Sequence, residues 1–248
     1  SGILAAAAEE FAQTQVQDAY SVRCAPQVAG GFRDTLTHAA TVADRELAAA
    51  VDNPVVALDG RVTSNGNFHG APVAYVLDFL AIVAADLASI SERRTDRFLD
   101  KARNRGLNAF LADDPGVDSG HMIAQYTQAG IVSEMKRLAA PASVDSIPSS
   151  AMQEDHVSMG WSAARALRKS VDGLQRVLAI ELLTAARAVD MRDGEPAKGT
   201  AAAIAALREV AEGPGTDRYL SPEIEAVVEL VVNGAVVNAV ENKVGALR

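Results

Sequence analysis

Residues 71–99 read APVAYVLDFLAIVAADLASISERRTDRFL, and their hydrophobic spacing decides the fold class. Apolar side chains recur every three or four positions, at Val73, Val76, Leu77, Leu80, Val83, Ala84, Leu87 and Ile90. Because residues three and four apart share one face of a helix, this spacing predicts a single long amphipathic helix. Such a helix would extend about 45 Å, whereas a compact domain of this length has a radius of gyration of only about 18 Å. We therefore expect an all-α fold, an elongated bundle of long helices.

Residues 71–90 form the most hydrophobic window of the chain, so a membrane span has to be considered. Asp78 and Asp86 lie inside this window. A carboxylate at the centre of a bilayer is costly, and two of them argue against a span. The window predicts a helix buried inside the protein.

The same spacing recurs elsewhere in the chain. It predicts further long helices over about 33–51, 119–138 and 159–189. Shorter terminal helices are expected within residues 196–248, as part of the same unit, near 200–212 and 222–240. Strand signals are brief, and the best is a hairpin of 55–58 and 61–63 around Asp59-Gly60.

Composition excludes several classes of partner. The chain has 32 acidic and 23 basic residues and a net charge of -9, which argues against nucleic acid or an anionic membrane. Its single cysteine, Cys24, fits a reducing cytoplasm and is expected to be a small buried residue rather than a nucleophile. The four histidines show no metal-ligand spacing, and no glycine-rich phosphate loop is present. We expect neither a metal site nor a nucleotide site.

Three polar, irregular stretches are expected beside the long helices, at 17–31, 52–70 and 141–158. The densest continues to residue 160 and reads PASVDSIPSSAMQEDHVSMG over 141–160. Gln153, Glu154, Asp155 and His156 place an amide, two carboxylates and an imidazole in four positions. Such a cluster suits a polar ligand and proton transfer, but a solvated loop that caps the next helix is an equally open interpretation.

This stretch resembles the signature of the histidine ammonia-lyases, which belong to the aromatic amino acid ammonia-lyase family. Four other stretches match in the same order, VQDAYSVRCAPQVAG at 16–30, NPV at 53–55, SNGNFHG at 64–70 and QYTQAGIVSEMK at 125–136. DRYLSPEI at 217–224 is similar to the family's C-terminal end. The resemblance therefore covers nearly the whole chain. In the fourth stretch Met135 replaces a common asparagine and is expected to fill the core, and Gly130 is expected at a close helix contact.

The resemblance implies an enzyme that eliminates ammonia from L-histidine to give urocanate. Family members use an electrophile, methylidene-imidazolone, made by cyclisation of an internal Ala-Ser-Gly. No Ala-Ser-Gly occurs in these 248 residues. We therefore expect residues 1–248 to be the C-terminal, helical-bundle portion of a larger enzyme and to be inactive alone. The tyrosine proposed as catalytic base comes from the other portion, so no base is assigned.

Site residues follow from the matching motifs. The resemblance implies catalytic roles for Tyr20, Gln153 and Glu154, with Arg23 and Glu154 binding the substrate. A guanidinium suits the substrate carboxylate, and Glu154 would contact the amine or the imidazole. Cofactor contacts are implied for three more residues, Gln17, Asn67 and Phe68, with Asn67 also a candidate for orienting its loop.

Plainer interpretations remain open for these residues. Arg23 and Tyr20 also suit a surface loop at a helix entry, and Asp155, His156 and His69 are expected to have structural roles. The resemblance further implies a homotetramer in which each active site takes residues from several subunits. Two alternatives to the histidine enzyme are a lyase or aminomutase for another aromatic amino acid, and a non-catalytic assembly protein.

Overall fold

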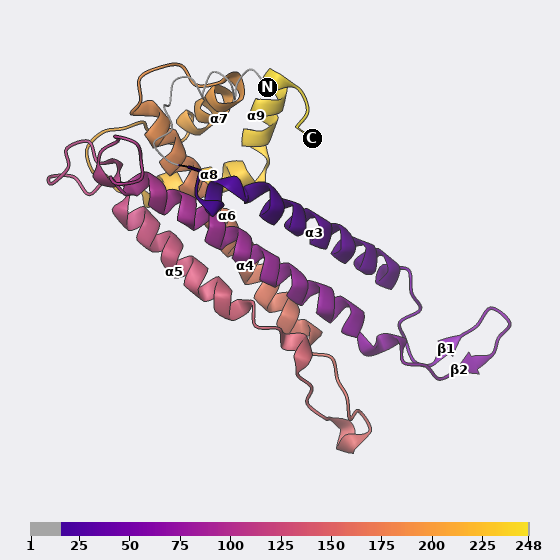
Figure 1. Ribbon diagram of the computed structural model, residues 1–248. Helices are drawn as coiled ribbons and strands as arrows, with labels where there is room; N and C mark the ends of the chain where they lie inside the picture. Colours follow the sequence, from indigo (N-terminus) through magenta and orange to yellow (C-terminus); the bar gives the residue numbers. More distant parts are fainter. Residues whose placement is uncertain (1–15, 248) are drawn as a thin grey trace. The chain divides into compact units, whose positions relative to one another are not determined.

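The computed structural model describes residues 16–247, which are helical apart from short turns, loops and one hairpin (Figure 1). The helices are α2 (Tyr20–Arg23), α3 (Ala25–Leu47), α4 (Ala71–Leu99), α5 (Met122–Leu138), α6 (Gly160–Asp190), α7 (Lys198–Arg208), α8 (Ser221–Val232) and α9 (Ala235–Val244). Three-residue 3-10 turns occur at η1 (Asn67–His69), η2 (Ala109–Leu111), η3 (Ala142–Val144) and η4 (Ser150–Met152). The predicted all-α class is confirmed.

The predicted hairpin is confirmed, with strands of two residues each. β1 (Val55–Val56) pairs antiparallel with β2 (Val62–Thr63), and Val55 lies opposite Thr63. Gly60 has a positive φ of 83° in the connecting turn, a conformation that glycine adopts without a Cβ clash.

The described residues divide into two compact units. The first unit comprises 16–25, 89–130 and 175–247, and the second comprises 26–88 and 131–174. The first unit therefore holds α2 and α7 to α9. The second holds α3, the hairpin and the turns η1, η3 and η4, and α4, α5 and α6 contribute residues to both.

The buried face of α4 consists mainly of small side chains. Its most buried positions include Ala74, Ala81, Ala84, Ala85, Ala88, Ser91 and Thr95. Most of the larger residues predicted for this face, such as Leu80 and Leu87, are only half-buried. Small residues are covered completely when helices approach closely, whereas longer side chains spread around the contact. The predicted bounds of α4 are correct, and its most buried line runs along the small residues.

Helix α4 also contains buried polar groups. Within residues 16–247, Asn67–Leu99 is the segment long and apolar enough to cross a membrane by length and composition. Asp78 is only 1% exposed, and its carboxylate accepts a hydrogen bond from the Ser143 backbone N–H at 2.7 Å. Glu92 is also buried. These groups have partners inside the protein, which fits the predicted buried helix.

Two close helix contacts occur at glycines in the second unit. A Cβ at Gly173 would lie 3.1 Å from Ile131 and from Met135, so α6 packs tightly on α5 there. Met135 is 1% exposed, which confirms it as a core residue. The close contact expected at Gly130 is wrong, because a Cβ there would meet nothing within 4 Å.

Two predicted boundaries are corrected. The stretch 17–31 was expected to be irregular, but α2 and α3 occupy most of it, because Pro26 lies in the first turn of α3, where its missing N–H costs nothing. The single helix predicted near 222–240 is two helices, and Gly234 separates them with a φ of 73°.

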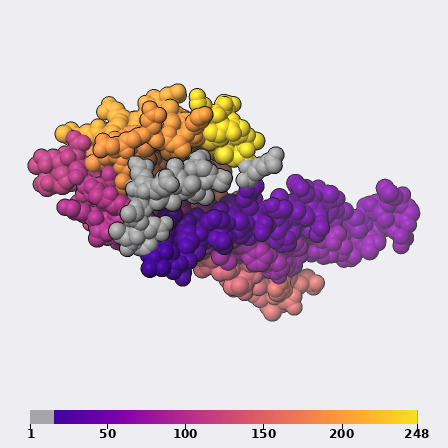
Figure 2. Space-filling model, turned by 45° about the horizontal axis from the view of Figure 1, so that its top comes forward, coloured from indigo at the N-terminus to yellow at the C-terminus, as the bar shows by residue number. Residues whose placement is uncertain are grey.

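Within α3 only Ala39 is buried, and Figure 2 shows the indigo side chains of this helix open along the face in view.

The core of the first unit lies where the end of α6 meets the terminal helices. Its buried members are Ala179, Leu183, Ala186, Leu207, Ala211, Val227 and Val228. Helix α7 approaches α9 closely, since a Cβ at Gly199 would lie 3.5 Å from Val240. The terminal helices thus pack as part of this unit.

Polar contacts near His121 complete the first unit, some exposed and some buried. The carboxylate of Asp217 accepts hydrogen bonds from the backbone N–H groups of Ser119 and Gly120, at 2.7 and 2.8 Å. His121 is 5% exposed and its Nδ1 lies 3.0 Å from the Thr184 hydroxyl. Burial, together with the positive charge of Arg187, lowers the pKa of His121 to about 4. The imidazole is therefore neutral in the folded chain at neutral pH.

The depressed pKa of His121 predicts loss of stability in acid. Between about pH 6.5 and about pH 4 the unfolded chain binds a proton that the folded chain does not, so the unfolding free energy falls as pH falls. The slope from this group is at most about 1.4 kcal/mol per pH unit. We expect urea midpoints of the parent to drop between pH 7 and pH 5 more than those of His121→Asn. Equal decreases of the urea midpoint in the parent and in His121→Asn would show that His121 does not cause the loss of stability in acid.

Candidate active site

The first group of predicted residues lies on α2, in the first unit. This short helix is closed by backbone bonds, including Arg23 N–H to Ala19 O at 2.9 Å. The Arg23 guanidinium carbon lies 4.7 Å from the centre of the Tyr20 ring, a cation–π contact. Tyr20 is 71% exposed and Arg23 is also exposed. Within residues 16–247 no carboxylate forms an ion pair with Arg23, so its donors are open to an external carboxylate.

The residues that precede α2 are held at the surface. Gln17 is exposed, and the structure shows no bond of its side chain to another described residue. The neighbouring Asp18 accepts a hydrogen bond from Arg105 at 3.2 Å. Cys24, expected to be buried, is half-buried at the end of α2. Gln17, Tyr20 and Arg23 therefore share one exposed segment of the first unit.

An ion pair on the long helices anchors this segment. Arg94 of α4 binds both carboxylate oxygens of Glu181 on α6, with its Nη2 at 2.8 Å from Oε2. The Ser91 hydroxyl donates to the same carboxylate. A further Arg94 N–H donates to the Ser21 carbonyl at 3.3 Å, between Tyr20 and Arg23. Both charged side chains are less than a quarter exposed, so water screens this pair weakly.

Substitution of Glu181 tests the anchor. Glu181→Gln leaves Arg94 mostly buried without its anion, and we expect the unfolding free energy to fall by about 2 kcal/mol in urea titrations. The matched control is Glu225→Gln, which opens the exposed pair with Arg176 and should cost less than about 1 kcal/mol. If both variants lose the same unfolding free energy, the Arg94–Glu181 pair stabilises the chain no more than an exposed ion pair does.

The second group of predicted residues lies in the second unit and begins at η1, before α4. The Asn67 amide donates to the Ala50 carbonyl at 3.0 Å, and the Asn67 N–H donates to the Asn65 side chain at 2.8 Å. The Asn67 side chain thus orients its turn, and its amide donor is used inside the chain. Phe68 is 56% exposed. Gly70 follows in a left-handed conformation with a φ of 73°, and α4 begins at the next residue.

The segment 141–158 carries Gln153 and Glu154 and is fixed at several points. Its beginning is held by the bond from Ser143 N–H to Asp78 described above. Near its end the Val157 N–H donates to the Ser146 hydroxyl at 2.8 Å. The Ser158 hydroxyl then accepts the Gly160 N–H at 3.1 Å, which caps the start of α6. The helix-capping interpretation of this polar segment is therefore correct for Ser158.

Glu154 is held by a single serine. The Ser149 hydroxyl donates to Glu154 Oε2 at 2.6 Å, and the Ser149 N–H donates to the Glu154 carbonyl at 3.0 Å. Glu154 is nevertheless exposed, so its other oxygen is available to a ligand. Gln153 is also exposed, and its N–H donates to the Ser150 carbonyl.

The turn η4 that leads into Gln153 has an unusual backbone. Ser150, Ala151 and Met152 have positive φ angles of 51°, 53° and 69°. Residues with a Cβ rarely adopt this left-handed region, and such strain is frequent at functional turns. Phe110 and Leu111 share the feature, so it is not confined to the predicted site.

A histidine pair joins the two turns of the second unit. His69 Nε2 lies 3.0 Å from His156 Nδ1 and 3.0 Å from the His156 carbonyl oxygen. The two rings stack with centres 5.1 Å apart and planes 15° apart. The backbone also approaches closely here, because a Cβ at Gly160 would lie 3.2 Å from the Ser158 hydroxyl and 3.8 Å from the Gly70 carbonyl. The pair brings the Asn67–Phe68 turn and the Gln153–Glu154 turn together.

The structure therefore groups the predicted residues into two sets. Gln17, Tyr20 and Arg23 lie on one segment of the first unit, and Asn67, Phe68, Gln153 and Glu154 lie on two joined turns of the second. Sequence reasoning missed the supporting residues Asp78, Arg94, Glu181 and Ser149. A carboxylate inside an apolar helix, as at Asp78, is the one clear signal that was available.

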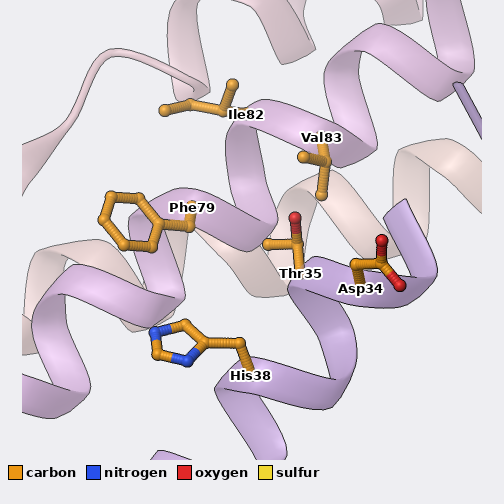
Figure 3. A pocket seen from close by; sticks show the side chains of 6 residues that line it. All are labelled: Asp34, Thr35, His38, Phe79, Ile82 and Val83. Atoms are coloured by element: carbon orange, nitrogen blue, oxygen red, sulfur yellow. The ribbon is translucent and has the colours of Figure 1, made fainter. Parts of the chain in front are cut away.

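A groove elsewhere in the second unit does not include these residues. It has a volume of about 410 Å³ and is lined from α3 by Asp34, Thr35 and His38 and from α4 by Phe79, Ile82 and Val83 (Figure 3). None of the predicted site residues lines it. Its location separates it from the two turns that the histidine pair joins.

Comparison with known proteins places this arrangement in a family. The model of the aromatic amino acid lyases matches residues 1–209. Histidine ammonia-lyase from Streptomyces avermitilis is 68% identical over 235 residues, which is 94% of this chain and 46% of that protein.

Solved structures agree. Histidine ammonia-lyase from Trypanosoma cruzi has a TM-score of 0.88 at 43% identity, over 92% of this chain and 45% of that one. Tyrosine aminomutase from Streptomyces globisporus has a TM-score of 0.87 at 35% identity, over 97% and 48%. The chain spans slightly less than half the length of these relatives. The motifs, the helical fold and the matched family model together establish that the chain belongs to the aromatic amino acid lyase family.

Proposed function

We propose that this chain is the C-terminal portion of a histidine ammonia-lyase, which converts L-histidine to urocanate and ammonia when the polypeptide is complete. The identity of 68% to the Streptomyces avermitilis enzyme supports the choice of histidine. The single observation that carries the proposal is Glu154, an exposed carboxylate that Ser149 holds in place. Such a carboxylate suits the imidazole or the amine of histidine, and it has no equivalent task with a phenyl ring.

Arg23 has the complementary task of binding the substrate carboxylate. Its guanidinium stacks on Tyr20, which fixes the plane of the donors, and the turn that carries both is bonded to Arg94. Forked N–H donors match the two oxygens of a carboxylate. We also assign the exposed Gln153, which precedes Glu154 in the sequence, to the site as a hydrogen-bonding group for the substrate.

The aromatic amino acid lyases depend on methylidene-imidazolone, which supplies an electrophile that activates the amino acid for loss of ammonia. The 248 residues contain no Ala-Ser-Gly from which to form it. Gln17, Tyr20 and Phe68 fit contacts with such a group, since all three are exposed and supply an amide, a phenol and an apolar ring. Asn67 fits less well, because its amide donates to Ala50. The chain alone is expected to be inactive.

A cytoplasmic homotetramer is part of the proposal. Large apolar side chains are exposed around the polar turns of the second unit, at Phe68, Val144, Ile147, Met152 and Trp161. Apolar side chains gathered near a site are typical of surfaces that another subunit covers. The net charge of -9 continues to argue against nucleic acid as a partner.

Urocanate formation tests the function. The complete polypeptide that contains this chain should convert L-histidine to urocanate, followed by ultraviolet absorbance, and should not act on L-tyrosine or L-phenylalanine. Conversion of tyrosine to its β-isomer instead would favour an aminomutase, the activity named for the Streptomyces globisporus relative. A folded tetramer without activity on any of these would favour a non-catalytic assembly protein.

Substitution of Glu154 tests its role. We expect Glu154→Gln in the complete enzyme to lower kcat/KM for histidine about tenfold or more, because the amide keeps the size and loses the charge. The matched control is Asp155→Asn, which removes the adjacent carboxylate and should change kcat/KM less than about threefold. An unchanged kcat/KM in Glu154→Gln would remove this residue from the site.

A further inference from the structure

The His69–His156 pair has a defined hydrogen-bond direction. A backbone carbonyl oxygen only accepts, so the His69 Nε2 that faces the His156 carbonyl at 3.0 Å must carry the hydrogen. The same Nε2 faces His156 Nδ1 at 3.0 Å, and that nitrogen must then present its lone pair. A hydrogen on His156 Nδ1 would place two donors against each other. Each ring is thus restricted in the position of its hydrogen, which a contact between freely rotating surface groups would not achieve.

Each histidine also lies close in sequence to predicted site residues. His69 directly follows Asn67 and Phe68 in η1, and His156 lies two residues after Glu154. The two histidines are 87 positions apart in the sequence, so sequence proximity does not bring them together. The structure shows no other side-chain hydrogen bond that joins the turn at 67–69 to the segment 149–157 within the described residues.

Other contacts leave the placement of Glu154 to this pair. Asp78 fixes the start of the segment at Ser143, and Ser146 fixes its end at Val157. Ser149 fixes the Glu154 carboxylate relative to its own turn. None of these bonds reaches η1. Among the side-chain hydrogen bonds of residues 16–247, those of the two histidines are therefore the ones that connect the Phe68 turn to the Glu154 turn.

We propose that His69 and His156 are positioning residues that hold the Glu154 turn in register with the Phe68 turn through a directional hydrogen bond from His69 to His156. This proposal deepens the proposed function and rests on it, because Glu154 is the group through which the pair acts. Neither histidine is required to touch the substrate. A displacement of about 1 Å at a reacting site lowers the rate by up to about 100-fold. A hydrogen bond that fixes the two turns relative to each other can therefore have a large effect on kcat.

Substitutions can separate the hydrogen bond from the bulk of the ring. His69→Gln places an amide N–H near the position of Nε2 and keeps the donor, whereas His69→Leu removes it. His156→Asn places an acceptor oxygen near the position of Nδ1, whereas His156→Leu removes it. His38→Leu is the matched control, because His38 is an exposed histidine of the second unit that lies on α3, away from both turns.

In the complete enzyme we expect His69→Leu and His156→Leu each to lower kcat for histidine about tenfold or more, with KM changed less than about threefold. His69→Gln and His156→Asn should restore kcat to within about threefold of the parent, and His38→Leu should leave it unchanged. The decisive variant adds His69→Leu to Glu154→Gln. If His69 acts through Glu154, the second substitution should lower kcat less than about twofold further. A purely structural histidine would lower kcat equally in both backgrounds.

A second readout keeps this proposal separate from the proposed function. Hydrogen exchange at the amides of Ser149 and Val157 reports directly on the segment and requires no turnover. We expect faster exchange at these amides in His69→Leu but not in His69→Gln, whether or not the parent enzyme acts on histidine. A parent enzyme without activity on histidine would overturn the proposed function but not the positioning role of the pair. Unchanged exchange and unchanged kcat in His69→Leu, or additive losses with Glu154→Gln, would overturn the positioning pair.

Discussion

Close approach of helices along the small residues of α4 is the constraint on which the rest of the structure depends. Alanines at positions 74, 81, 84, 85 and 88 let neighbouring backbones come near, and Ser91 and Thr95 continue the line. Interiors packed at this density transmit position from one element to the next. The same helix begins at η1, holds Ser143 through Asp78 and holds Ser21 through Arg94. Within the second unit the turns that carry predicted site residues are thus attached to α4, and within the first unit the segment that contains Tyr20 and Arg23 is attached to it.

In each case a side chain of a long helix forms a hydrogen bond with the backbone of a short helix, a turn or a loop. Asp78 accepts from the Ser143 N–H in the turn η3, and Arg94 donates to the Ser21 carbonyl in the short helix α2. Arg187 of α6 likewise donates to the Leu111 and Gly215 carbonyls in the first unit. Backbone groups of loops need partners, and a charged side chain supplies a strong one. Rigid helices thereby give precise positions to exposed polar residues without burying them.

Sequence reasoning was strongest where periodicity is long and uninterrupted. The bounds of α4 and α6 follow closely from their apolar spacing, whereas the start of α3 was missed because Pro26, Gly30 and Gly31 resemble loop residues. The break at Gly234 was overlooked inside an apolar run. Motif resemblance supplied Tyr20, Arg23, Phe68 and Glu154 as candidates. It did not supply their supports, because the pairing of His69 with His156, or of Arg94 with Glu181, depends on contacts across almost 90 residues.

The left-handed turn at Ser150–Met152 has a mechanical consequence. Each of its three residues is held in a region that costs L-amino acids roughly 1–2 kcal/mol. The hydrogen bonds at Ser149, Val157 and His156 hold the segment that contains this strained backbone. Loss of those bonds removes the contacts that hold the strained backbone, so the strain lowers the net free-energy cost of opening the segment. The bonds at Ser149, Val157 and His156 must together outweigh this strain in the folded chain.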